Sequence, residues 1–96
     1  MTITLPKARY REATERPTTS LTLRGIALEL VALSHDLDAF PGILDRVEIR
    51  RDAQTVRLTA VLFDDGAISA HYAGAMLEAS SKLLERLEDV ATKASR

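Results

Sequence analysis

The apolar residues of this chain change their spacing at Pro41-Gly42, and this change constrains the fold more than any other feature. Before it, large apolar residues recur every three or four positions, which places them on one face of an α-helix. Ser20 or Thr22 is a suitable N-cap, and Pro41 cannot continue a helix. The pattern therefore predicts a helix from about residue 20 to residue 40. Its apolar face consists of Ile26, Leu30, Leu33, Leu37 and Phe40, widened by Leu23, Ala27 and Val31.

After Gly42 apolar and polar residues alternate, and this period of two is typical of half-buried β-strands. Residues 51–54 contain turn-forming types and would connect two antiparallel strands. The resulting register places Glu48 opposite Arg57, an ion pair that would add about 0.2–1 kcal/mol. The expected core-facing side chains are Val47 and Ile49 on the first strand and Val56, Leu58, Ala60 and Leu62 on the second.

Asp64-Asp65-Gly66 is the next turn signal, because glycine readily takes the left-handed conformation that ends a three-residue hairpin loop. A hairpin here would pair Leu62 with Ile68 and continue residues 67–73 as a third strand. The alternative is a helix that begins near Ser69. The alanine-rich composition favours this alternative, whereas Gly74 opposes it, since glycine inside a helix costs about 1 kcal/mol. Of the two, we predict the strand.

The last segment returns to helical spacing, with an apolar stripe that includes Met76, Leu83, Leu87 and Val90. The order of elements is then α-β-β-(β)-α. We predict a small single α+β domain over residues 20–96, in which an antiparallel sheet carries both helices on one face. Residues 1–19 are basic and contain two prolines, and we expect them to form an extended or disordered arm.

The bulk composition excludes several functions. The chain has 96 residues, enough for one domain, and it contains no cysteine, which excludes disulfides, thiolate catalysis and cysteine-ligated zinc. Its 13 basic and 14 acidic side chains give a net charge of −1, so no global positive field attracts nucleic acid or an anionic membrane. Neither a signal peptide nor a membrane span is recognisable. We expect a cytoplasmic protein that does not bind membranes.

The outer face of the predicted sheet carries more apolar surface than a solvated face needs. Val61 and Phe63 would point away from the helices, and large exposed apolar side chains indicate a contact site. The final helix offers a second surface, because its apolar stripe is wider than one groove. The candidate interface residues are Val61, Phe63, Ala67, His71, Leu77, Leu84 and Ala91.

No set of residues forms a convincing catalytic or metal-binding constellation. His35-Asp36 is a metal-ligand pair in some hydrolases, but His71 is the only further histidine and would be the only acid–base group on the open sheet face. Residues 36–42 start like a calcium loop but have Pro41 where the turning glycine is required, and turn chemistry accounts for Asp64-Asp65. We therefore predict no catalytic residue, no metal ion and no cofactor.

Two functions from different classes fit these features. The first is a non-enzymatic protein-interaction module (a regulatory adaptor, accessory subunit or binding chaperone) that acts as a homodimer or on another protein. The second is a small nucleic-acid-associated protein, because the arm and the predicted sheet could form one phosphate-binding strip. Its candidate residues are Lys7, Arg9, Arg11, Arg16, Arg50, Arg51 and Arg57. The slightly acidic net charge makes this function the second choice.

Overall fold

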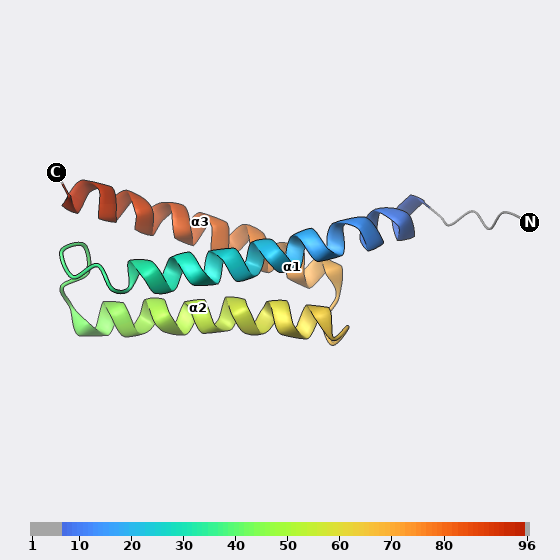
Figure 1. Cartoon of the computed structure of the whole chain (residues 1–96), viewed down its shortest axis with the longest axis horizontal. Coiled ribbons are helices and arrows are strands. Elements are labelled where there is room, and N and C mark those ends of the chain that lie inside the picture. The colour runs from blue at the N-terminus through green and yellow to red at the C-terminus, as the bar shows by residue number, and fades with distance from the viewer. Residues whose placement is uncertain (1–6, 96) are drawn as a thin grey trace, which may run out of the picture.

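The computed structural model describes the backbone of residues 7–95 and the side chains of residues 18–95, and its regular elements are all α-helices. The helices are α1 (Lys7–Leu33), α2 (Ile43–Asp64) and α3 (Ala70–Ala94). Consecutive helices run in opposite directions, and α1 packs against both of the others (Figure 1). The predicted α+β fold with an antiparallel sheet is wrong, since the described residues contain no strand.

α2 replaces the whole predicted hairpin. No glycine or proline interrupts residues 43–64, so the loop expected at residues 51–54 has nothing to break a helix. The apolar residues of this segment also recur at helical spacing, in addition to the alternation with polar residues that suggested strands. The buried residues of α2 are Ile49, Ala53, Val56, Thr59, Ala60 and Phe63, whereas Val47 and Leu58 of the predicted core face are about half exposed.

α1 ends earlier than predicted, because Asp36 organises a turn in place of further helix. Its Oδ1 accepts hydrogen bonds from the backbone N–H groups of Asp38 and Ala39, at 3.2 and 3.1 Å. The chain then returns Phe40 to the core, where its side chain is 6% exposed, and leaves Leu37 at 62%. Arg46 fixes this loop by donating to the carbonyl oxygen of Phe40 at 2.9 Å.

The described part of the predicted N-terminal arm is helical. Residues 7–19 form the first half of α1, which projects beyond the other two helices in Figure 1. Residues 1–6 and the side chains of Lys7, Arg9, Arg11 and Arg16 lie outside the described residues. The assignment of residues 20–96 to one domain stays a prediction.

The alternative start of the last helix is the correct one, and the predicted third strand is wrong. Ser69 is the N-cap of α3, and its Oγ accepts a hydrogen bond from the backbone N–H of Tyr72 at 3.1 Å. Gly74, which opposed this helix, lies in its second turn. The turn predicted at residues 64–66 is present, but it connects two helices. Gly66 has a φ of +74° and completes a Schellman motif, in which Ala67 N–H bonds to the Leu62 carbonyl at 2.8 Å.

The core is a strip of aliphatic side chains with two aromatic residues, Phe40 and Phe63. Its largest fully buried apolar side chains are Phe63, Leu23 and Leu30, and Ala53, Ala60 and Ala73 are at most 1% exposed. Four small polar residues are also buried. Three of them donate to carbonyl oxygens of their own helix, so their burial leaves no unpaired hydroxyl: Ser34 to Val31, Thr59 to Thr55 and Ser80 to Leu77.

The molecule is long and thin, with extents of 62 × 25 × 15 Å. Its radius of gyration is 16.5 Å, against about 12.5 Å for a compact domain of this length. The exposed surface is 7080 Å², whereas a folded monomer of 10.6 kDa exposes about 5,500 Å². The first half of α1, which projects beyond the other two helices in Figure 1, contributes to this difference of about 1,600 Å².

Replacing each of two glycines with alanine is expected to change the free energy of unfolding in opposite directions. Gly66→Ala forces a side chain into the left-handed region and should lower the free energy of unfolding by about 1 kcal/mol. Gly74→Ala adds a Cβ with nothing within 4 Å in a helix, and should raise it by about 0.5–1 kcal/mol. Urea denaturation followed by circular dichroism measures both. Equal effects of the two substitutions would contradict the assigned turn.

Candidate interaction surface

α1 carries a second apolar stripe, separate from the one that forms the core. Leu21 and Leu28 are 71% and 72% exposed and lie seven positions apart, two turns along the same face. Gly25 and Ala32 share this face, so the four residues follow the alternating spacing of four and three that is typical of helix–helix seams. We call these four residues, Leu21, Gly25, Leu28 and Ala32, the outer seam.

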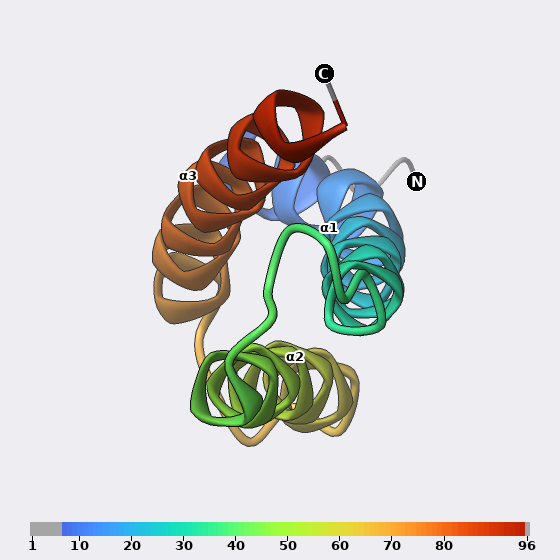
Figure 2. The ribbon, with the colours of Figure 1, turned by 90° about the vertical axis from the view of Figure 1, so that its left-hand side faces the viewer.

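The outer seam forms a ridge between two grooves, since Leu28 lines a groove between α1 and α2 and Ala32 lines a groove between α1 and α3. At 3.6 residues per turn it lies about half a turn from the stripe of Leu23, Ile26 and Leu30, which are buried. In the end-on view of Figure 2, α3 lies to the left of α1 and α2 lies below it. Leu21, Leu28 and Ala32 are exposed, whereas Gly25 is half-buried.

Gly25 has no role in the packing of the described residues. A Cβ at this position would meet nothing within 4 Å, and the residue has ordinary helical backbone. Glycine in a helix costs about 0.5–1 kcal/mol relative to alanine. The residue thus lowers helix stability and leaves a shallow hollow between Leu21 and Leu28, where another chain could approach closely.

A groove with a volume of about 700 Å³ runs beside the outer seam, between α1 and α2. Its floor is apolar and its walls carry three arginines and a histidine. The lining residues are Arg24, Ala27, Leu28, Val31, His35, Arg50, Ala53, Gln54 and Arg57. No acidic side chain is among them, so the lining of this groove is positively charged, although the net charge of the chain is −1.

Two of these arginines are held by neighbouring groups. Arg24 Nη2 lies 2.7 Å from Asp64 Oδ2 and connects α1 to the end of α2, with both side chains about 40% exposed. Arg50 donates from Nε to Ser34 Oγ at 3.1 Å and from Nη2 to His35 Nδ1 at 3.2 Å. These contacts fix the width of the groove by linking its two walls.

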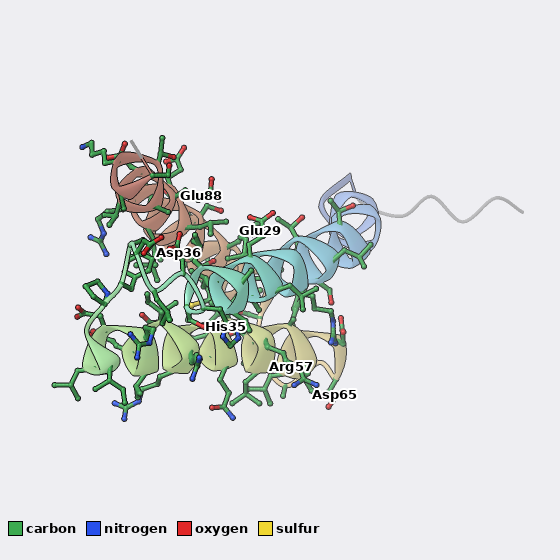
Figure 3. The ribbon with its side chains drawn as sticks, turned by 60° about the vertical axis from the view of Figure 1, so that its left-hand side comes forward. Glu29, His35, Asp36, Arg57, Asp65 and Glu88 are labelled. Atoms are coloured by element: carbon green, nitrogen blue, oxygen red, sulfur yellow. The ribbon has the colours of Figure 1, made fainter. Side chains whose placement is uncertain are left out.

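The opposite side of α1 is acidic. Glu29, Asp36 and Glu88 line a shallow groove of about 330 Å³ between α1 and α3, and Figure 3 shows them apart from His35 and Arg57. A further groove of about 390 Å³ between α2 and α3 contains Asp45, Glu48 and Asp52 together with Arg86. Within the described residues, no three histidine or carboxylate side chains gather as ligands for a metal ion.

The structure separates the residues predicted for an interface, because the sheet face that suggested them is absent. Phe63 is 2% exposed and Leu84 is 9% exposed, so both belong to the core. Val61, Leu77 and Ala91 are half-buried on α2 and α3. Ala67, in the turn after α2, and His71, in the first turn of α3, are exposed and distant from the outer seam along the chain.

The residues predicted for nucleic-acid binding are partly brought together. Arg50 and Arg57 line the α1–α2 groove with Arg24, whereas Arg51 is exposed on α2 outside its lining. The predicted ion pair between Glu48 and Arg57 depended on the hairpin and is lost with it. His35 lies two residues beyond the end of α1.

Sequence reasoning missed the outer seam. Leu21 and Leu28 fell between the residues of the main stripe, and Val31, which is 39% exposed, was assigned to the core face. A usable signal existed in the spacing of four, three and four from Leu21 to Ala32.

The described helices include none with the length and apolarity needed to cross a membrane. No protein-family model, curated protein or solved structure matches the chain.

Proposed function

We propose that this chain is a small non-enzymatic protein-interaction module that works as a homodimer through the outer seam of α1. The observation that carries the proposal is the exposure of Leu21 and Leu28, above 70% each, on a continuous face of a helix that already buries its other face. Isolated exposed leucines are common on protein surfaces, but a regular seam of them is typical of a helix that has a partner.

The size of the uncovered surface supports the same function. A standard protein–protein interface removes about 800 Å² from each partner, and this chain exposes about 1,600 Å² more than a compact monomer of its mass. A regulatory adaptor, an accessory subunit and a binding chaperone are the roles that fit such a module. We place it in the cytoplasm, where disulfides are rare and a chain without cysteine loses no stabilisation by lacking them.

Nucleic-acid binding is the second candidate, and one observation favours it. Arg50 and Arg57 line one groove with Arg24, which makes a local cationic surface despite the net charge. However, Arg24 is paired with Asp64, and Arg50 is held by Ser34 and His35. Phosphate contacts would have to compete with these bonds, so the arginines fit the role of connecting α1 to α2 better.

Light scattering coupled to size-exclusion chromatography tests both functions on the purified full chain. The proposal expects a mass near twice 10.6 kDa at micromolar concentration that does not fall between 0.05 and 0.5 M salt, since apolar contacts are insensitive to screening. A monomer at every concentration contradicts it. The chain has no tryptophan, so co-purified nucleic acid would raise the absorbance ratio at 260 and 280 nm clearly. Salt-sensitive retention of nucleic acid by a monomer would favour the second function.

A further inference from the structure

We infer that two copies of the chain pair antiparallel through α1, with each leucine of the outer seam seated on a small residue of the other copy. In this register Leu21 lies level with the partner's Ala32, and Leu28 lies level with the partner's Gly25. The inference rests on the proposed function and adds the direction and register of the contact. A two-fold axis between residues 26 and 27 then relates the copies, which makes the interface self-complementary.

The alternation of large and small residues determines the direction. In an antiparallel helix pair, an a position of one heptad repeat lies level with a d position of the other. The leucines of the outer seam occupy one of these positions and the glycine and alanine occupy the other, so each layer contains one leucine and one glycine or alanine. Large side chains facing small ones fill the space between helices without voids. The hollow at Gly25, which nothing within 4 Å fills, is then occupied by a leucine of the second copy.

A parallel pair would pack less well. It would place Leu28 against the partner's Leu28 and Gly25 against the partner's Gly25, and the leucine layers would hold the helices too far apart for the glycine layers to touch. Parallel pairing would bring Arg24 near the partner's Glu29. That gain is small, because Arg24 already contacts Asp64 at 2.7 Å and exposed ion pairs contribute little.

The charges beside the seam are compatible with the antiparallel register. In an antiparallel pair, each residue that flanks the seam lies beside a residue at the same heptad position of the partner. Arg24 therefore lies beside the partner's Val31, and Glu29 lies beside the partner's Thr22. Like charges therefore do not meet. The α1 wall of the arginine groove, which includes Arg24, Leu28 and Val31, then borders the contact, whereas Arg50 and Arg57 lie on its α2 wall.

Disulfide trapping tests the register directly, since the natural chain has no cysteine. We would make Leu21→Cys and Ala32→Cys separately, mix the two proteins, oxidise them mildly and map the bonds by mass spectrometry. Trypsin cleaves after Arg24, so the two cysteines fall in different peptides. A disulfide needs Cα atoms within about 7 Å, and positions eleven residues apart on a helix are about 16 Å apart.

The expected result is a bond between Cys at position 21 of one copy and Cys at position 32 of the other, with little bonding in either protein alone. Leu44→Cys, on an exposed leucine of α2, measures random collision. Bonds formed within each single variant and not between the two overturn the antiparallel register while leaving the homodimer intact. A monomeric natural chain, seen by light scattering, overturns the proposed function as well. Circular dichroism verifies that each variant keeps the helicity of the natural chain.

Discussion

Replacing Leu28 with lysine is expected to convert the proposed homodimer into a monomer. Two copies of Leu28 lie near the two-fold axis of the proposed pair, and each buries a side chain that is 72% exposed in the single chain. Burying one leucine contributes about 1.5–3 kcal/mol, so losing both should raise the dissociation constant about 10²- to 10⁴-fold. Sedimentation velocity over a hundredfold range of concentration would show the change as a loss of the larger species.

Leu44→Lys is the matched control for this substitution. Leu44 is 80% exposed at the start of α2 and lies outside the outer seam, so the same change of side chain should leave the dimer intact. Neither variant should lower the helicity of the chain, because both leucines are exposed. A dimeric Leu28→Lys protein, or equal dissociation of the two variants, would show that α1 does not form the contact.

Phe63→Ala is expected to destabilise the fold severely. Phe63 is 2% exposed and is the largest of the fully buried side chains, so its removal leaves a cavity in a thin core. Substitutions of this kind cost about 3–5 kcal/mol. The free energy of unfolding of a domain of this size is about 5–15 kcal/mol, so much of the stability would be lost. Urea denaturation monitored at 222 nm measures it directly.

Leu58→Ala provides the comparison on the same helix, five residues earlier. Leu58 is 54% exposed, and its truncation should change the free energy of unfolding by less than about 1 kcal/mol. The predicted sheet expects the opposite order, with Leu58 in the core and Phe63 on the outer face. A larger effect at Leu58 than at Phe63 would therefore favour the sheet over α2.

The turns at Pro41-Gly42 and Gly66 could be predicted, whereas both ends of α1 and the whole of α2 could not. Pro41-Gly42 and Gly66 mark real boundaries, because proline and the left-handed glycine impose local backbone geometry whatever the tertiary fold. The segment between them failed for a physical reason. Its apolar residues fit a period of two and a helical spacing together, and burial of Ala53, which alternation had placed in a loop, decides for the helix.

The surface could be predicted in part only. The sequence located uncovered apolar side chains on a sheet face, at Val61 and Phe63, whereas Phe63 is 2% exposed and Val61 is half-buried. Which stripe of a helix becomes the core depends on where the other helices pack, and α1 has two candidate stripes. Packing selected Leu23 and Leu30 and left Leu21 and Leu28 outside, a choice that local spacing does not determine.

The two faces of α1 connect folding with assembly. One face holds the core together and the opposite face forms the proposed contact, so a second copy would hold the central helix of the first in its native conformation. Mass action then makes the folded fraction depend on the amount of protein present. At low abundance each chain would have only its thin core, whereas at higher abundance unfolding would first require dissociation. The lifetime of the folded chain in a cell would therefore increase with the concentration of the protein.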